Sequence, residues 1–426
     1  MAEYLKTGRP PGTSTDPEVR QRVATILDDI AKRGELAVRE WSATLDHHDP
    51  DSFLLGAADV ERAVAGVEPE LRGHIDAAYD HVGAFARAQL ATLTPLEVEL
   101  APGQVLGHRI VPVRAVGAYV PGGRYPLISS ALMSILTART AGVDRVVAMT
   151  APGRDGRIPD PTVYAMHKAG AEQIYALGGV QAMGALAFGA LPGLDPVDMI
   201  VGAGNAYVAE AKRQLFGRVG IDLLAGPTEV LVVADETADP YVVAVDLLAQ
   251  AEHGPTSPAI LIALSRDLAE RVLAHIPAIL ESWSTGDVAG TAWNDLGVAV
   301  VAGSREEAVE LSDAYAPEHL QLQVAEPDWY EARLRNYGTV FVGEETTVAY
   351  GDKAVGTNHT LPTNGAARYT GGLWVGSYLK VLTYQRLTRD ASLRIGAHTS
   401  AISTAEGMVG HAASADVRLA RYGNGG

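Results

Sequence analysis

Apolar positions repeat with a helical period in the N-terminal part of the chain. Residues 17–45 carry this repeat in two parts that divide at Gly34, and Asp16 followed by Pro17 is typical of a helix start. A longer amphipathic stretch covers residues 69–92. The repeat predicts two helices and then a long one in this part of the chain.

The pattern changes at about residue 110, where short apolar runs begin to alternate with helical stretches. Each run ends in Gly, Pro or a polar residue, as buried parallel strands do before a crossover helix. The runs cover residues 145–152, 173–179, 199–205, 229–235, 259–265, 298–304 and 339–345. They form two series and predict an α/β fold with two Rossmann-like doubly wound domains, N-terminal helices and a helical C-terminal extension.

Domain boundaries follow from the two series. Residues 1–118 and 230–368 are assigned to a first Rossmann-like domain that includes the N-terminal helices, and residues 119–229 to a second. The remaining segment, residues 369–426, is helical in texture. A chain of 426 residues is too long for one ordinary core, which agrees with a division into domains.

Composition narrows the class of protein. Apolar residues make up 47% of the chain and charged residues 20%, no run of 18 apolar residues occurs, and the N-terminus lacks the apolar region of a signal peptide. A cytoplasmic protein without a membrane segment is expected. The formal net charge is -17, from 34 basic and 51 acidic residues, and no long basic cluster is present, which disfavours nucleic acid as a partner.

The chain has no cysteine, so disulfides, thiolate metal sites and cysteine nucleophiles are excluded. A metal would have to be held by His, Asp, Glu or Gln. The stretch "DLLAQAEHGP" at 246–255 places Gln250 and His253 one turn apart on a predicted buried helix. The two side chains either bond to each other and to backbone or converge on a metal.

Other ionisable residues occur in pairs. "YAPEHLQL" at 315–322 places Glu318 beside His319, which suits a proton relay, although the pair taken alone favours a solvated glutamate next to a capping histidine. Asp352 and His359 share a loop rich in Gly and Thr. Glu406 and His411 lie near the C-terminus.

A set of nitrogen and oxygen ligands without sulfur suits a catalytic zinc more than a structural one. Gln250, His253, Asp352 and His411 would make such a set. Only the first two are close in sequence, so spacing alone does not select these four.

Glycine-rich turns border three of the predicted strands, at residues 119–126, 177–184 and 202–212. None is a complete G-x-G-x-x-G, so the glycines alone are a weak sign of a dinucleotide site. Tight strand-to-helix turns are the alternative. Ligands of doubly wound sheets do bind at this position, outside the carboxyl ends of the strands.

These motifs together carry a resemblance to a known family. From about residue 15 to about residue 415 the sequence resembles histidinol dehydrogenase, through "GAYVPGG", "GGVQAMGALAFG", "GNAYVAEAK", "DLLAGPTEVLVVAD", "DLLAQAEHG", "YAPEHL", "GTNHTLPT" and "EGMVGH" in the family's order. The resemblance implies a homodimer that uses zinc and NAD to oxidise a primary alcohol to a carboxylate in two steps.

The resemblance also implies roles for individual residues, which follow by motif. Zinc would be held by Gln250, His253, Asp352 and His411, and acid/base chemistry would fall to Glu318 and His319. NAD would contact Tyr119, Gln181 and Asn205, and the substrate would contact Thr228, His359 and Glu406. The family's C-terminal segment crosses to the partner subunit, so Glu406 and His411 would complete the partner's site.

The absence of cysteine fits this mechanism. A thiohemiacetal cannot form on the protein, so the aldehyde would be hydrated by water that Glu318 and His319 activate, and a second NAD would oxidise the hydrate. In the first step zinc would lower the pKa of the alcohol and His319 would take the proton.

Two departures from the family bear on the substrate. Val348 stands where histidinol enzymes carry a glutamate, and the glycine loop reads "PGGRYP" with Arg124. Together with "YTGGLWVG" at 369–376, this text resembles the side branch that includes sulfopropanediol 3-dehydrogenase. Arg124 would then bind an anionic group of the substrate, or alternatively the NAD pyrophosphate or a neighbouring acid.

Three functions are therefore weighed. The first is oxidation of a small anionic polyol such as 2,3-dihydroxypropane-1-sulfonate to sulfolactate, and the second is oxidation of histidinol in histidine biosynthesis. The third is a binding role for an inactive paralogue, which retention of the complete set of candidate ligands and acid/base residues disfavours.

Overall fold

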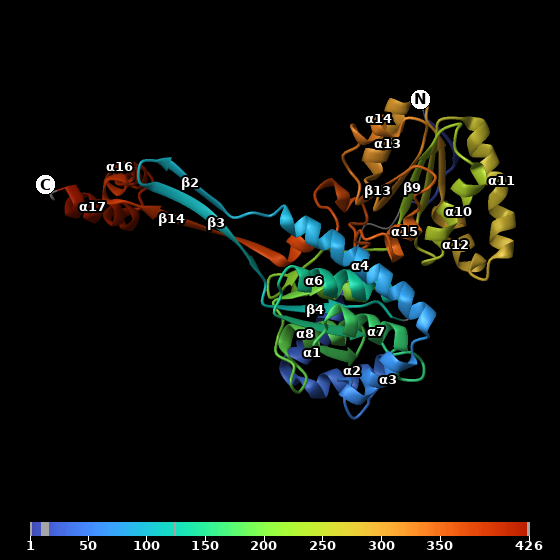
Figure 1. Cartoon of the computed structure of the whole chain (residues 1–426), viewed down its shortest axis with the longest axis horizontal. Helices are drawn as coiled ribbons and strands as arrows, with labels where there is room; N and C mark the ends of the chain where they lie inside the picture. The colour runs from blue at the N-terminus through green and yellow to red at the C-terminus, as the bar shows by residue number, and fades with distance from the viewer. Residues whose placement is uncertain (1, 10–16, 123–124, 424–426) are drawn as a thin grey trace.

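The chain forms two units built on parallel sheets and a long arm that projects from one of them (Figure 1). The structure is a computed structural model and describes residues 2–9, 17–122 and 125–423. Asp16 and Arg124, both singled out from the sequence, lie outside the described residues. Among the described helices, none combines the length and the apolar character needed to cross a bilayer.

The first unit contains a six-stranded sheet in the order β1-β11-β10-β9-β12-β13. Strands β9 to β13 are parallel, and β1 joins the edge antiparallel to β11. The strands are β1 (Glu3–Lys6), β9 (Val230–Ala234), β10 (Ala259–Ala263), β11 (Val298–Val301), β12 (His319–Gln323) and β13 (Thr339–Val342). Successive residues of β9 enter separate apolar clusters on the two faces, so the sheet is covered on both sides.

The second unit contains a five-stranded parallel sheet in the order β6-β5-β4-β7-β8. Its strands are β4 (Ala115–Tyr119), β5 (Arg145–Thr150), β6 (Gln173–Ala176), β7 (Met199–Val201) and β8 (Gly220–Ile221). Both sheets reverse their strand order beside the first strand, between β9 and β12 and between β4 and β7. This is the arrangement of doubly wound folds and confirms the predicted fold class.

Helices cover both faces of each sheet. Around the six-stranded sheet lie α10 (Pro240–Ala251), α11 (Arg266–Ser282), α12 (Gly286–Leu296), α13 (Arg305–Tyr315), α14 (Pro327–Glu331) and α15 (Val348–Lys353). Around the five-stranded sheet lie α5 (Ile128–Ala131), η1 (Leu132–Leu136), α6 (Thr137–Thr140), α7 (Asp160–Ala169), α8 (Gly179–Phe188) and α9 (Ala206–Leu215).

The N-terminal helices are α1 (Pro17–Arg33), α2 (Glu35–Leu45), α3 (Ala57–Gly66) and α4 (Pro69–Ala91). Their existence was predicted, but their assignment to the six-stranded unit was wrong, because all four pack on the five-stranded unit. Helix α1 buries its apolar face against α8 and α9, and α3 packs on α7. An amphipathic pattern shows that one face of a helix is buried, but it does not identify the element on which that face packs. The boundary at residue 119 also moves, since β4 begins at Ala115.

The arm consists of β2 (Leu96–Ala101), β3 (Gln104–Pro112) and β14 (Leu379–Leu387), with α16 (Arg389–Ala405) and α17 (Val409–Gly423) at its tip (Figure 1). The predicted helical C-terminal extension is present as α16 and α17, and the strand β14 that precedes them was not predicted. Before β14, the chain forms η2 (Ala366–Arg368) and η3 (Val375–Tyr378), and Leu373 and Tyr378 are buried in the core of the five-stranded unit.

Candidate active site

Helix α10 delivers two of the predicted metal ligands to one end of the six-stranded sheet. Asp239 caps its first turn by accepting from two backbone N–H groups, and Pro240 occupies the first helical position. Gln250 lies in the last turn and is buried, while His253 lies in the turn just beyond the helix. The helix runs back along the sheet, so its end meets the amino ends of the strands.

Glu318 and His319 lie at the same edge, where β12 begins. Both are buried, with exposed fractions of 5% and 2%. The carboxylate of Glu318 accepts from the Thr228 hydroxyl at 2.5 Å and from the Glu229 backbone N–H at 2.9 Å. The predicted pair therefore forms part of a packed network, and a solvated loop position is ruled out.

The imidazole of His319 is held through one nitrogen. Nδ1 is 2.9 Å from the carbonyl oxygen of Glu229, which can only accept, so Nδ1 carries the hydrogen. Nε2 is buried, has no hydrogen-bond partner, and lies 3.6 Å from Oδ1 of Asp352. The ring thus presents Nε2 toward the metal-ligand candidates.

Asp352 comes from the short helix α15, which follows β13. Its Oδ2 lies 3.7 Å from Nε2 of His253. His359, from the next loop, contacts the Asp352 backbone oxygen through Nδ1 at 3.0 Å and the Ser130 hydroxyl through Nε2 at 2.8 Å. Both ring nitrogens of His359 are thus engaged with protein groups, which gives it a supporting position behind Asp352.

Thr228 connects the two parts of this cluster. Its hydroxyl donates to Glu318 and accepts from the amide nitrogen of Gln250, each at 2.5 Å. Because the nitrogen of the Gln250 amide is used in this way, its oxygen is the atom left to act as a ligand.

The electrostatics of the cluster are those of buried charges in contact. Burial by itself lowers the pKa of His319, but Glu318 and Asp352 beside it raise that pKa to about 10. Burial opposes the charge of Asp352, yet the contact with His319 holds the pKa of Asp352 well below its ordinary value. Burial lowers the pKa of His253 and of His359, which favours the neutral imidazole that binds metals.

A cavity of about 330 Å³ opens beside these residues, between the two units. One wall is formed by Tyr125, Pro126 and Leu127 from the loop after β4. The other wall comes from α10, α15 and nearby loops, and includes Asp246, Gln250, Glu252, His253, Thr285, Thr347, Val348, Asp352 and Lys353. Val348 therefore borders the cavity at the place where a glutamate is absent.

The predicted cofactor residues gather at the carboxyl edge of the five-stranded sheet. Tyr119 ends β4 and its hydroxyl accepts from the Gly179 N–H at 3.2 Å. Gln181 is fully buried near the start of α8, with its amide nitrogen 2.6 Å from Asp46 and its amide oxygen without a partner. Asn205 caps α9. This edge is where doubly wound sheets bind ligands.

Two predicted residues lie elsewhere. Glu406 and His411 are exposed at the tip of the arm, on or beside α17, and do not join the cluster within one chain (Figure 1). Arg124 belongs to the part of the chain that is not described.

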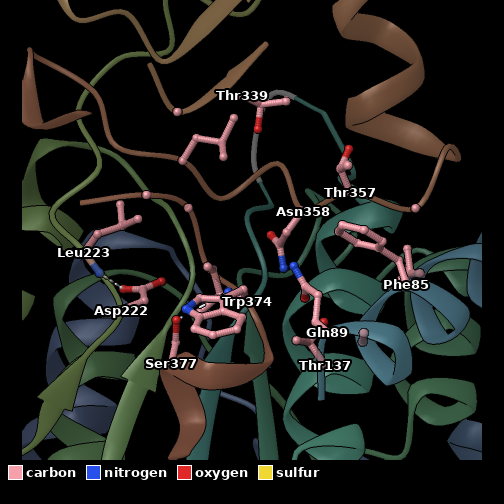
Figure 2. A pocket seen from close by; sticks show the side chains of 18 of the residues that line it. Phe85, Gln89, Thr137, Asp222, Leu223, Thr339, Thr357, Asn358, Trp374 and Ser377 are labelled. Carbon is pink, nitrogen blue, oxygen red and sulfur yellow. Dashed lines mark hydrogen bonds between the residues drawn. The ribbon is translucent and has the colours of Figure 1, made fainter. Parts of the chain in front are cut away.

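A second cavity, of about 380 Å³, lies between α4 and the loops at 356–361 and 370–377. Figure 2 shows Asn358, Trp374 and Ser377 bordering it. Asp222 is the single acid among its described lining residues and is ion-paired with the buried Lys212. None of the predicted metal or acid/base residues lines this space, so the first cavity is the better candidate for chemistry.

Comparison with known proteins agrees with the arrangement. The family model described as histidinol dehydrogenase matches residues 10–419. A histidinol dehydrogenase homolog of Shouchella clausii is 51% identical, over 99% of this chain and 100% of that protein. The sulfopropanediol 3-dehydrogenase of Ruegeria pomeroyi is 46% identical, over 99% of this chain and 97% of that protein.

The chain belongs to the histidinol dehydrogenase family. Members of this family are oxidoreductases that act on CH–OH groups. The fold agrees as well: the crystal structure of histidinol dehydrogenase from Elizabethkingia anophelis has a TM-score of 0.92 and 32% identity, covering 98% of this chain and 95% of that one.

Three residues of this family member are compatible with a zinc ion. The 3.7 Å between His253 and Asp352 is close to the edge of a zinc tetrahedron, roughly 3.4 Å from the usual bond lengths. Gln250 adds an amide oxygen. Among the described residues no three His, Cys, Asp or Glu side chains gather as a metal site.

Two neighbours of the cluster were not predicted from the sequence. Glu229 is buried directly before β9, and Lys353 follows Asp352 and lines the cavity. An acid immediately before a buried strand was the available sign for Glu229. For Lys353 the sign was a cation next to a predicted ligand.

Proposed function

We propose that this protein is a zinc- and NAD-dependent dehydrogenase that oxidises the primary alcohol of a small anionic polyol to a carboxylate through the aldehyde. The candidate substrate is 2,3-dihydroxypropane-1-sulfonate, which would give sulfolactate. The observation that carries the proposal is the cavity where Gln250, His253 and Asp352 meet the buried pair of Glu318 and His319.

Zinc would be held by Gln250, His253 and Asp352, with His411 of a second subunit as the fourth ligand. NAD would lie along the carboxyl edge of the five-stranded sheet, near Tyr119, Gln181 and Asn205. When bound, zinc would supply Lewis acidity and NAD would supply the hydride acceptor.

The protein's own part in the chemistry is proton transfer. Nε2 of His319 faces the ligand cluster. Zinc bound to Asp352 would offset one of the two carboxylates that raise the pKa of His319, so the ring would be neutral and Nε2 would take the proton of the alcohol. Glu318, 3.4 Å from Nδ1, stabilises the resulting imidazolium. In the second stage the same pair would activate water for hydration of the aldehyde, since the chain has no cysteine to form a covalent intermediate.

Two positions in the cavity wall support an anionic substrate, and the acids Asp246, Glu252 and Asp352 share that wall. Val348 leaves the wall without a carboxylate at that position, and Lys353 brings a cation. The acids Asp246 and Glu252 in the wall accept hydrogen bonds from neighbouring side chains. The 46% identity to a sulfopropanediol 3-dehydrogenase points the same way. Arg124 is proposed as a second cation, with substrate or NAD as its partner.

We propose a homodimer in which the arm crosses to the partner. Exposed apolar side chains are unusually frequent on the arm of a single chain, and such surface is normally covered. They include Leu96, Leu100, Val381, Ile402, Val409 and Val417, each at least 50% exposed. In this arrangement Glu406 and His411 would reach the partner's cavity.

The test is an assay of the purified protein with zinc and NAD on two alcohols. 2,3-Dihydroxypropane-1-sulfonate should be oxidised with two NAD reduced per sulfolactate formed, histidinol should be turned over poorly, and chelation should abolish activity. Efficient turnover of histidinol with none of the sulfonate would instead identify an L-histidinol dehydrogenase, the alternative that the family supports. A zinc-loaded protein that oxidises neither alcohol would instead support a binding role for an inactive paralogue.

A further inference from the structure

Glu229 is a buried carboxyl group that the proposed chemistry does not use. It lies directly before β9 with 8% of its surface exposed. An unpaired acid in such a place is costly, and an apolar side chain of similar size would pack there without that cost. No described Lys or Arg forms an ion pair with it, so charge pairing does not explain its presence.

The contacts of Glu229 concern the backbone around the acid/base pair. Strands β9 and β12 are neighbours in parallel register, with His319 opposite Val230, so Glu229 and Glu318 stand side by side one residue earlier. Each carboxylate accepts the backbone N–H of the other glutamate: Glu318 accepts from Glu229 at 2.9 Å, and Glu229 accepts from Glu318 at 3.3 Å.

Two further contacts extend this reciprocal pair. The carboxylate of Glu229 also accepts from the backbone N–H of Asn364, which ties it to the loop that carries His359. Its carbonyl oxygen holds Nδ1 of His319 at 2.9 Å. Glu229 thus contacts the backbone before His319, the ring of His319, and the loop behind Asp352.

We propose that Glu229 is a positioning residue for the acid/base pair, fixing Glu318 and His319 through the two N–H groups that its carboxylate accepts. The inference rests on the proposed function, because it assigns Glu229 a role in that reaction. Its burial and the neighbouring Glu318 raise the pKa of Glu229 to about 7, in keeping with a carboxyl group enclosed at the centre of the site.

The test compares two substitutions that differ in the acceptor alone. Glu229→Gln keeps an oxygen that can accept the two N–H groups, and Glu229→Met has a similar volume without any acceptor. Glu229→Met should lower kcat about 10- to 100-fold, the scale of misplacing a catalytic group, with KM for both substrates within about twofold and zinc content unchanged. Glu229→Gln should recover kcat to within about threefold of the wild type.

A matched control is Asp235→Leu. The carboxylate of Asp235 also accepts two backbone N–H groups, from Thr237 and Ala325, and Asp235 follows the carboxyl end of β9, opposite to Glu229. This variant should lower stability and leave kcat unchanged. If Glu229→Met does not fold, Glu229→Asp serves in its place, because the shorter side chain withdraws the acceptor, and it should show the same loss of kcat.

Two kinetic results would overturn the positioning role: wild-type kcat in the Met or Asp variant, or an equal loss of kcat in the Gln and Met variants. A substrate-independent measurement separates this from failure of the proposed function. In protein labelled with ¹⁵N-histidine, the Nδ1 signal of His319, assigned with His319→Gln, should shift in Glu229→Met and stay in place in Glu229→Gln. A wild type without dehydrogenase activity but with this shift would reject the proposed function and keep the positioning contact. An unmoved signal would reject the positioning role.

Discussion

Individual side chains at the site are fixed by what each of their atoms can do. A carboxylate only accepts and an amide nitrogen only donates, so the Thr228 hydroxyl has one possible orientation between Gln250 and Glu318. That orientation leaves the amide oxygen of Gln250 for a metal. One hydroxyl therefore links the candidate zinc ligands to the candidate acid/base pair, and it assigns a different task to each group.

The two histidines of the cluster should fail in different ways. His253→Ala removes a proposed ligand, so zinc and activity should be lost together. His319→Ala removes the proton acceptor only, so zinc should remain while kcat falls roughly 10²- to 10⁴-fold. Metal analysis and steady-state assays on the same preparations check both statements. Loss of zinc in His319→Ala would show that the two roles were exchanged or shared.

Glu229 should make the metal-free protein less stable as pH rises. The folded-state pKa of this acid is raised to about 7, so between its ordinary value and about 7 the folded protein binds the extra proton. Stability is then lost across this window as pH increases, by about 3 kcal/mol at most. Glu229→Gln lacks this titration, so its melting temperature relative to the wild type should rise between pH 5.5 and pH 8.5. A difference that stays constant with pH would contradict a raised pKa.

Lys353 should matter for the charge of the substrate. It lines the cavity, and its charge helps to lower the pKa of His253 and of His359, which places it near both. Lys353→Met should raise KM for the sulfonate roughly tenfold, which corresponds to about 1.4 kcal/mol, and leave KM for NAD unchanged. Lys32→Met, at an exposed position on α1, is the control. An unchanged KM for the sulfonate would remove Lys353 from the binding site.

At the scale of elements, the sequence best predicts the helices and strands whose buried residues are apolar. The apolar runs at 145–152, 229–235 and 259–265 contain β5, β9 and β10, which are buried except at the first residue of β5, and α10 was recognised from its apolar spacing. Strand β12 was missed because two of its five residues are glutamines, which are buried and donate to Asp246. A strand with a polar buried face carries no hydrophobic signal.

The strands of the arm and the grouping of the site residues could not be predicted from the sequence either, for different reasons. Strand β2 is exposed along nearly its whole length in a single chain, so its pattern does not separate a buried face from a solvated one. At the site, Gln250 and His253 are close in sequence and could be paired by spacing. Asp352 and Glu318 arrive from other elements, and only the family resemblance connected them before the structure did. The placement of Glu318 at the amino end of β12 is likewise invisible without the sheet order.

Asp246 should hold the elements of the metal site in place. One turn before Gln250, its carboxylate accepts from Gln321 at 2.5 Å, Gln323 at 2.9 Å and Thr347, the residue before α15, at 2.9 Å. Asp246→Asn sets an amide N–H group against these donors, which should loosen α15 and weaken zinc binding about 10- to 100-fold. Chelator competition measures this.

Asp235→Asn is the matched control for Asp246→Asn. Asp235 follows β9 at the carboxyl end of the sheet, opposite to the site, and its carboxylate also accepts hydrogen bonds. Zinc affinity should be unchanged in this variant. Equal zinc affinity in both variants would mean that Asp246 supports the fold without positioning the ligands.

At the scale of the whole molecule, the single chain looks incomplete in two matching ways. The described cluster offers one imidazole, one carboxylate and one amide, and the proposed fourth zinc ligand, His411, is not among them. The arm carries an exposed histidine and exposed apolar side chains away from any core of its own chain (Figure 1). The proposed twofold dimer would account for both, because in a symmetric dimer each arm can supply what the other core lacks.

Mixing inactive variants tests this arrangement. His253→Ala and His411→Ala homodimers should each be inactive, since every site lacks one ligand. In a shared arrangement, a heterodimer contains one site with an intact core from the His411→Ala chain and an intact arm from the His253→Ala chain. Random exchange of equal amounts should then restore about one quarter of wild-type activity, because half the dimers are mixed and each has one working site. The control mixes His253→Ala with Gln250→Ala, two core variants that cannot complement each other in any dimer. With subunit exchange verified by mass spectrometry on differently tagged chains, no recovery in the first mixture would show that each chain builds its own site.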